Sequence, residues 1–246
     1  MLGIMTWNTS LRPTAVITGA SRGIGKAVLM DLALTHRILA GASTSESLSW
    51  IHEPGALPQD AEVVPFIADL SDEASVAAAV DEAGLTHLDV LVNSAGIADE
   101  RPFDSFTRQD WRASFEVNVF AVADLTARLL PALRTARGIV VMINSGSGIF
   151  SYAGGAVYTG TKFALRTMAD CLREEERDRG VRVTSVHPGF VATDMGHRLR
   201  REAGTDGDEY TYVTPETVAA SVRHAISAPE TSQVESITVR PAHKPA

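Results

Sequence analysis

Apolar residues recur along the chain in short runs, separated by stretches in which they fall at helical spacing. The runs Leu88–Asn93 and Ile139–Asn144 are almost entirely apolar, as is typical of parallel strands covered on both faces. Together the runs predict seven strands, at Ala15–Thr18, Arg37–Ala42, Val63–Ile67, Leu88–Asn93, Ile139–Asn144, Arg182–His187 and Val234–Val239.

Helix signals lie between these strands. Lys26–Leu34 has helical spacing, and Ser71 is the predicted N-cap of a helix over Asp72–Ala83 with an acidic first turn. Further helices are predicted at Thr107–Ala136, with a bend near Pro131, at Val157–Arg179, ended by Gly180, and from the Thr214-Pro215-Glu216 start to Ala228.

Regular alternation of strand and helix predicts an α/β fold with an open, doubly wound parallel sheet. Without an internal repeat or a linker, residues 14–246 are expected to form one domain, preceded by an arm at 1–13. Two segments look irregular, Ser43–Ala61 and the polar, glycine-bearing His197–Tyr212.

Composition narrows the functional classes. The formal net charge of −8 and pI near 5.4 give no basic surface for nucleic acid, and no apolar run approaches the roughly 18 residues of a membrane span. Met1–Pro13 lacks the basic and apolar regions of a signal peptide, so a cytoplasmic location is expected. The single cysteine, Cys171, excludes an intramolecular disulfide and a multi-cysteine metal site, and it is read as a packing residue.

A glycine-rich turn, Thr18 to Gly25 (TGASRGIG), follows the first strand and opens the first helix. A helix N-terminus offers unpaired N–H groups and the positive end of the dipole, which suit a pyrophosphate, and glycines let the backbone approach it. The alternative is a turn that only links strand to helix.

Tyr158 and Lys162 stand at i and i+4, adjacent on one helix face, in a chain with only three lysines. A nearby ammonium favours the phenolate, so Lys162 is expected to lower the pKa of Tyr158 and make proton exchange with a substrate oxygen feasible. An ordinary surface pair is the alternative. Ser145 and Ser147 follow the fifth strand, where open α/β sheets bind ligands, although both could merely satisfy loop backbone groups.

The form TGxxxGIG, together with the segments above, resembles the short-chain dehydrogenase/reductase family over about Ala15 to Met195. The resemblance implies a Rossmann-like sheet of strand order 3-2-1-4-5-6-7. It implies Ser145, 13 residues before Tyr158, as the catalytic serine, with Ser147 as its rival. It also implies Asn118 as a structural and proton-relay residue, for which helix bending or a buried hydrogen bond is the alternative.

The implied reaction is hydride transfer between a nicotinamide cofactor and a carbonyl or alcohol. Tyr158 acts as the acid or base, Ser145 binds the carbonyl, and Lys162 holds the nicotinamide ribose. The resemblance implies cofactor contacts from Gly19, Ser21, Arg22, Gly23, Ile24, Gly25, Ser43, Asp69, Leu70, Asn93, Ala95, Gly96, Tyr158, Lys162, Pro188, Gly189, Val191, Thr193 and Met195.

NADP (NADPH) is favoured over NAD. An acidic residue at the end of the second strand would bind the ribose 2′-hydroxyl of NAD, and the chain has Ala42-Ser43-Thr44 there. Arg22 can reach a 2′-phosphate, although the arginine that many relatives carry near position 42 is missing. Thr161 stands where relatives usually have serine, and Val239-Arg240-Pro241 lacks their glycine pair.

The substrate is expected to be a small to medium ketone, aldehyde or secondary alcohol. The expected pocket has apolar walls with a few hydroxyls, from Ile97, Ser147, Phe150, Tyr152, Phe190 and a loop at about 194–213 that closes over the substrate. No metal is expected. The long helices imply a homodimer or homotetramer. A non-catalytic nucleotide-binding or scaffolding protein, and an epimerase or dehydratase, remain the alternatives.

Overall fold

Seven parallel strands form one sheet in the computed structural model, which describes residues 12–204 and 211–243. The strand order is β3-β2-β1-β4-β5-β6-β7, which confirms the predicted fold class and topology. The strands are β1 (Thr14–Ile17), β2 (Arg37–Ala42), β3 (Glu62–Ile67), β4 (Val90–Asn93), β5 (Ile139–Ile143), β6 (Arg182–Pro188) and β7 (Ser236–Val239).

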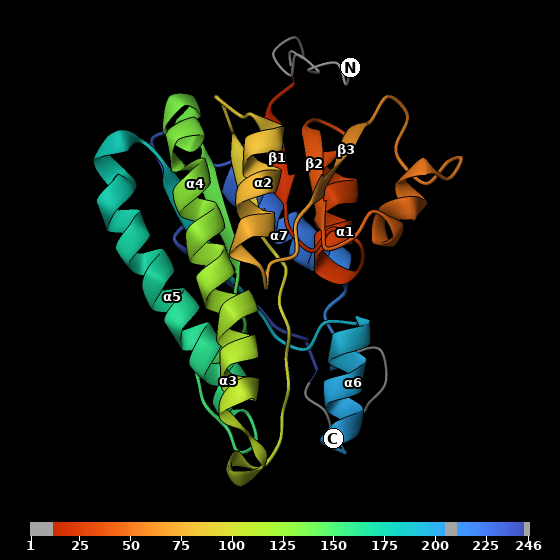
Figure 1. Cartoon of the computed structure of the whole chain (residues 1–246), viewed down its shortest axis with the longest axis vertical. Helices are drawn as coiled ribbons and strands as arrows, with labels where there is room; N and C mark the ends of the chain where they lie inside the picture. Colours follow the sequence, from red (N-terminus) through yellow and green to blue (C-terminus); the bar gives the residue numbers. More distant parts are fainter. Residues whose placement is uncertain (1–11, 205–210, 244–246) are drawn as a thin grey trace.

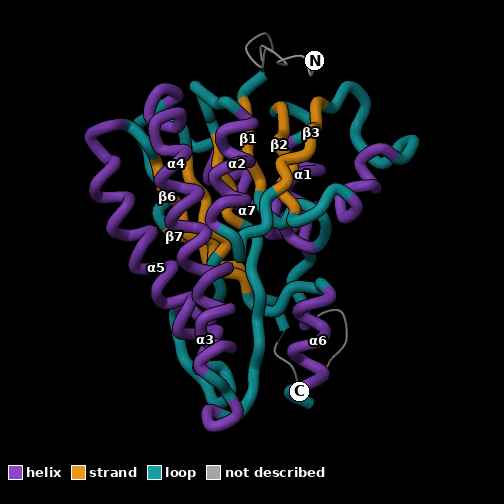
Figure 2. Tube along the Cα trace, in the orientation of Figure 1, coloured by secondary structure: helices purple, strands orange, loops and turns teal. Residues whose placement is uncertain are grey.

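Helices cover both faces of the sheet (Figures 1 and 2). Successive residues of β1 point to opposite faces. Ile17 packs in the core under α1 (Gly23–Leu32) and α7 (Pro215–Ile226), whereas Val16 packs under α2 (Glu73–Ala83), α4 (Ala121–Ala136) and α5 (Ala156–Glu176). Both side chains are fully buried, which stabilises the fold by roughly 1.5–3 kcal/mol each. This burial on both faces is the reason why the central strands β1, β4 and β5 are mostly apolar.

The Ser43–Ala61 segment contains only a 3₁₀ helix, η1 (Glu46–His52), so the expected lack of a full crossover helix is confirmed. The His197–Tyr212 prediction was wrong in part, because α6 (Asp194–Glu202) occupies its first residues. Thr193 caps α6 by accepting a hydrogen bond from the Gly196 N–H at 3.2 Å. Three parts of the chain lie outside the described residues: 205–210 of the predicted loop, 1–11 of the predicted arm, and 244–246.

The predicted cap of α2 was also wrong. Asp72, not Ser71, is the N-cap, and its carboxylate accepts from the Ala74 N–H at 3.0 Å. Ser71 instead donates its hydroxyl to Asp69 Oδ1 at 2.7 Å. The carboxylate one residue closer to the helix therefore takes the capping position.

The long helix predicted at Thr107–Ala136 is broken at a different place from the one expected. It comprises α3 (Arg108–Phe115), a π-helical turn η3 (Glu116–Phe120) and α4, and Pro131 lies inside α4 without ending it. A π turn fits one extra residue into a helix. The irregularity coincides with Asn118, whose side chain is bound to two other segments.

The short helices η2 (Phe103–Ser105), η4 (Gly146–Gly148) and η5 (Arg177–Arg179) complete the described elements, and Gly180 ends η5 in the left-handed conformation. None of the described helices combines the length and apolar character that crossing a membrane requires. Among the same residues no group of three or more His, Cys, Asp and Glu side chains could hold a metal.

Candidate active site

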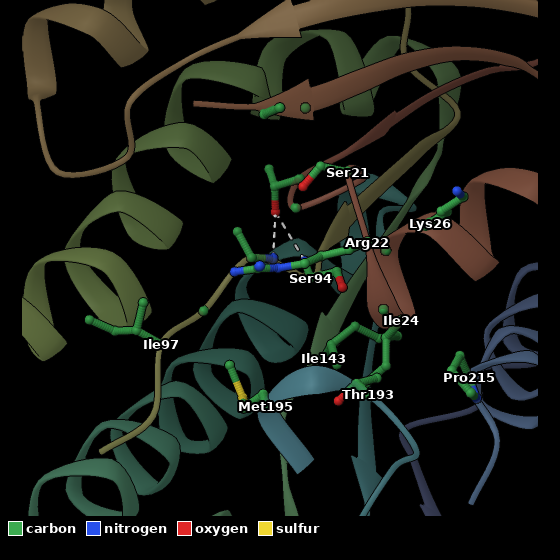
Figure 3. Close-up of a pocket in the computed structure, with 18 of the residues that line it drawn as sticks. Ser21, Arg22, Ile24, Lys26, Ser94, Ile97, Ile143, Thr193, Met195 and Pro215 are labelled. Carbon is green, nitrogen blue, oxygen red and sulfur yellow. Dashed lines mark hydrogen bonds between the residues drawn. The ribbon is translucent and has the colours of Figure 1, made fainter. Parts of the chain in front are cut away.

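The glycine-rich turn joins β1 to α1 and packs tightly against the segment after β4. Gly19 has φ +66°, and a Cβ there would lie 2.8 Å from the Ala95 Cα. A Cβ on Gly25 would lie 2.2 Å from the Gly19 carbonyl oxygen. Thr18 Oγ1 accepts from the Ser94 and Ala95 N–H groups at 3.0 and 3.1 Å (Figure 3). Only glycine fits these two positions, so the turn is fixed by its neighbours.

A cleft of about 1530 Å³ opens at the carboxyl ends of the strands, beside this turn. Figure 3 shows Arg22, Ile24, Ser94 and Thr193 around it. The predicted residues that line it are Gly19, Ser21, Arg22, Gly23, Ile24, Gly25, Ser43, Asp69, Leu70, Ala95, Gly96, Ile97, Tyr158, Lys162, Thr193 and Met195. The N-terminus of α1 has no side-chain cap and no acidic residue in its first turn, so its N–H groups suit an anion.

Other predicted residues lie behind the lining. Asn93 is buried, and its Nδ2 donates to Thr126 Oγ1 at 3.1 Å. Gly189 and Val191 bind backbone partners, since the Gly189 N–H donates to the Val239 carbonyl and Val191 forms a β-bridge with Val213. Pro188, the last residue of β6, accepts at its carbonyl from Arg240 at 3.2 Å. These residues support the walls of the cleft from behind and do not line its surface.

Tyr158 and Lys162 lie on α5 and face the cleft. Lys162 Nζ lies 5.7 Å from the centre of the Tyr158 ring and donates to the Ile143 carbonyl at 2.9 Å. The Lys162 residue is 5% exposed. Because an ammonium has three donors and one is engaged within the described residues, Lys162 has donors left for a ligand.

The pKa values of these two groups differ from the sequence-based expectation. Burial raises the pKa of Tyr158 to about 12, hydrogen bonding with Ser145 opposes that rise, and the negative charge of Glu100 adds to it. Burial lowers the pKa of Lys162 to about 8. The prediction that Lys162 lowers the pKa of Tyr158 is therefore not met, because loss of hydration disfavours both charged forms.

Ser145 and Ser147 have different surroundings. Ser145 Oγ accepts from the Ser147 N–H at 3.1 Å, which leaves its hydroxyl proton for donation toward Tyr158 or a ligand. The Ser147 hydroxyl is hydrogen-bonded to the Tyr152 hydroxyl at 3.1 Å. The buried His187 holds this loop from below, with its Nδ1 3.1 Å from the Ser145 carbonyl oxygen. Ser145 contacts Tyr158, and Ser147 is turned toward a different partner.

Asn118 uses its whole amide to join two segments. Its Oδ1 accepts from the Ile97 N–H at 2.9 Å, and its Nδ2 donates to the Ile97 carbonyl at 2.8 Å and to Thr161 Oγ1 at 3.1 Å. Thr161, the residue that departs from the family pattern, is fully buried and donates to the Tyr158 carbonyl at 2.7 Å. The Asn118 side chain thus clamps the wall after β4 to the helix that carries Tyr158.

Glu100 was not among the site residues predicted from the sequence. Its Oε1 accepts from the Tyr152 hydroxyl at 2.5 Å, which brings the carboxylate to the Ser147 side of the site. Loss of hydration, and then the bond to Glu100, raise the pKa of Tyr152. Glu100 and Tyr152 are 52 residues apart, so no local pattern could have joined them.

Basic residues that line the cleft were also missed. Lys26, Arg198 and Arg201 line it in addition to Arg22. Arg22 and Asp194 are 3.9 Å apart and both are highly exposed, whereas Lys26 Nζ lies 3.9 Å from the centre of the Trp50 ring. The signal was present as the basic run at 198–201, but that run was read as part of a loop.

Comparison with known proteins gives a consistent assignment. The sequence pattern described as short chain dehydrogenase matches residues 13–204. The chain is 28% identical over 238 residues to a serine 3-dehydrogenase of Agrobacterium fabrum, covering 94% of each chain.

Two solved structures are similar in both fold and sequence. An alcohol dehydrogenase of Thermococcus sibiricus, complexed with 5-hydroxy-NADP, has a TM-score of 0.84 and 26% identity, over 96% of this chain and 99% of that one. A metagenomic short-chain oxidoreductase in complex with NADP has a TM-score of 0.79 and 30% identity, over 94% and 98%.

Proposed function

The chain belongs to the short-chain dehydrogenase family, and on this premise we propose that it interconverts a carbonyl and an alcohol, with NADP preferred over NAD. The observation that carries the proposal is the convergence of Ser145, Tyr158 and Lys162 beside one large cleft. A hydroxyl donor, a phenol and a partly unpaired ammonium are the groups that a carbonyl oxygen and a ribose require.

The residues of the cleft fit a nicotinamide dinucleotide. The uncapped N-terminus of α1 suits the pyrophosphate, and the buried Lys162 ammonium has donors left for ribose hydroxyls. When bound, the cofactor supplies or accepts the hydride.

Reduction needs a donor for the carbonyl oxygen. In the proposal Ser145 donates its free hydroxyl proton as a hydrogen bond to that oxygen, and Tyr158 transfers its phenolic proton to it. A tyrosine with its pKa raised to about 12 is protonated at neutral pH, which is the state that reduction requires. In alcohol oxidation the proton returns to the Tyr158 phenolate.

Two residues position these groups. Lys162 binds the Ile143 carbonyl with one donor and directs the others at the ribose. Asn118 keeps α5 at a fixed distance from the wall after β4. A proton relay at Asn118, which the family resemblance implies, stays a prediction.

The preference for NADP is supported by the charges at the cofactor end. Arg22, Lys26 and Arg201 line the cleft there, and β2 ends in Ala42-Ser43-Thr44 without an acidic residue. The NADP found with two similar structures agrees with this choice. We expect Arg22→Ala to raise the Kd for NADPH by about tenfold or more and the Kd for NADH much less, since it removes one phosphate partner.

The control for this measurement is Arg108→Ala, which removes an exposed arginine from α3, away from the cleft. It should leave both constants at their wild-type values. Equal losses of NADPH and NADH binding in Arg22→Ala would remove the basis for the preference.

The experiment that tests the whole proposal is a fluorescence titration with NADPH and NADH, followed by a panel of ketones, aldehydes and secondary alcohols. Saturable binding that is tighter for NADPH, with cofactor oxidation by members of the panel, is the expected result. If neither cofactor binds, the non-catalytic alternative replaces the reductase.

A further inference from the structure

Glu100 is a carboxylate beside the proposed catalytic groups whose charge is not balanced by a basic partner. Within residues 12–204 and 211–243 its carboxylate accepts one hydrogen bond, from the Tyr152 hydroxyl at 2.5 Å, and forms no ion pair. The residue is half-buried.

The cations nearest in the sequence and in the loop are engaged elsewhere. Arg101 binds Asp99 at 2.7 Å and Asp110 at 3.1 Å. Arg240 donates to the Pro188 carbonyl and lies 5.5 Å from the centre of the Phe150 ring. Arg198 donates to the Ala98 carbonyl at 2.7 Å and pairs with Glu202 at 3.1 Å. None of these three arginines forms an ion pair with Glu100, so its charge is available to a group that enters the site.

Glu100 is connected to the reacting groups through hydrogen bonds. Tyr152 donates to Glu100, the hydroxyls of Tyr152 and Ser147 are 3.1 Å apart, and the Ser147 N–H donates to Ser145 Oγ at 3.1 Å. The charge of Glu100 also raises the pKa of Tyr158. Glu100 is therefore linked to the side of the site that holds Ser145, and its charge is felt at Tyr158.

The walls beside Glu100 also favour a cation. The Tyr152 ring stands at Glu100, and its centre is 6.2 Å from that of Phe150, whose ring already faces the Arg240 guanidinium. Aromatic faces attract cations, and an ammonium next to a half-buried carboxylate is stabilised more than one in water.

We propose that Glu100 and Tyr152 form a subsite for a positively charged nitrogen, so that the preferred substrates are amino ketones and amino alcohols with nitrogen next to the reacting carbon. This inference rests on the proposed carbonyl–alcohol reaction and names its substrate class.

The test compares three ketones with NADPH at neutral pH. Aminoacetone and butanone differ only in an ammonium in place of a methyl group, and acetoacetate carries a carboxylate instead. For the wild-type protein we expect kcat/KM for aminoacetone to exceed that for butanone by at least tenfold, with acetoacetate below both. The reason is that Glu100 attracts the ammonium and repels the carboxylate.

Glu100→Gln removes the charge and keeps the size of the side chain, so the ratio of kcat/KM for aminoacetone over butanone should fall at least tenfold. Glu100→Asp, which keeps the charge, should retain most of the ratio. Glu82→Gln, an exposed carboxylate on α2, is the matched control and should keep the wild-type ratio. Circular dichroism checks that each variant is folded.

The outcomes separate this inference from the function on which it rests. Three outcomes would overturn the inference and leave the proposed reductase activity intact. They are a wild-type ratio of kcat/KM for aminoacetone over butanone near one, a preference for acetoacetate, and an unchanged ratio in folded Glu100→Gln. NADPH binding without turnover of any of the three ketones also overturns the inference. If the protein binds neither NADPH nor NADH, the proposed function fails together with the inference.

Discussion

Tyr158 and Lys162 carry opposite pKa shifts that have one physical cause. Removing a phenol from water disfavours its anion, and removing an ammonium from water disfavours its cation. The pKa of Tyr158 is therefore raised to about 12, and that of Lys162 is lowered to about 8. At neutral pH Tyr158 therefore keeps its proton, and Lys162 still carries a positive charge.

Tyr158→Phe should lower kcat for carbonyl reduction by at least about 100-fold, because phenylalanine has no proton to donate. Binding of NADPH should persist, since Lys162 and the glycine-rich turn are unchanged. Steady-state rates and a fluorescence titration on the same preparation measure both quantities. Turnover near the wild-type rate would exclude Tyr158 as the acid.

The direction of the Tyr158 shift gives a pH dependence. A group with a raised pKa stays protonated through the neutral range, so the phenolate needed for alcohol oxidation grows about tenfold per pH unit below about 12. We expect kcat/KM for oxidation to rise steadily between about pH 6 and 8. Over that range the protonated phenol needed for reduction stays at its full population.

Both profiles can be measured in one buffer series, with cofactor concentrations kept saturating. A plateau of the oxidation rate below about pH 7 would show that the pKa of the catalytic base is not raised.

At the scale of elements, the π turn η3 is the feature that joins the cofactor wall to the catalytic helix. Asn118 in this turn makes three hydrogen bonds, two to Ile97 and one to Thr161. The π turn interrupts the regular α-helix. The contacts that Asn118 makes from it fix α5 against the segment after β4.

Asn118→Ala should destabilise the protein by about 2–3 kcal/mol, since three buried hydrogen bonds of roughly 1 kcal/mol each are lost. For a chain of this size that lowers the Tm by roughly 4–12 °C. It should also raise the Kd for NADPH, because the wall at Ala95 and Gly96 lines the cleft. Thermal unfolding with and without NADPH measures both effects.

Gln109→Ala is the control, since Gln109 is exposed on the preceding helix α3. Its Tm and its affinity for NADPH should match those of the wild type. An Asn118→Ala variant as stable as this control would mean that the clamp contributes nothing.

The elements that could be predicted are those defined by local periodicity. All seven strands were located within two residues. The clearest are β4 and β5, which are short, mostly apolar runs buried on both faces. Helix α6 was missed because its charged residues hide the signal, although Thr193 and Asp194 form a recognisable start. The break at Asn118 could not be predicted, since its cause lies in two distant segments.

At the scale of the whole molecule, an aromatic row runs from η2 along α3 to the π turn and comprises Phe103, Trp111, Phe115 and Phe120. Neighbouring ring centres are 6.2–6.3 Å apart, and Phe103 and Phe120 are 71% and 53% exposed. Exposed apolar surface of this kind is typical of interfaces. We propose that the row contributes to the homodimer or homotetramer that the family resemblance implies.

Phe120→Lys should shift the molar mass measured by light scattering from an oligomer toward the monomer, because a charge within an apolar interface lacks a partner. Leu34→Lys, which changes a 62% exposed apolar residue just after α1, is the matched control and should leave the mass unchanged. An oligomer of wild-type mass in Phe120→Lys would place the interface elsewhere.

The sequence by itself determined the fold class, the strand order through the family pattern, the glycine-rich turn and the Tyr158–Lys162 pair. These follow from spacing along a few residues, which a strand or a helix converts directly into position. Only the tertiary structure decided the contact between Glu100 and Tyr152, the Asn118 clamp and the direction of the Tyr158 pKa shift. The reason is that all three features depend on which distant groups come into contact and on how much water is excluded from them. Neither can be predicted from the order of neighbouring residues.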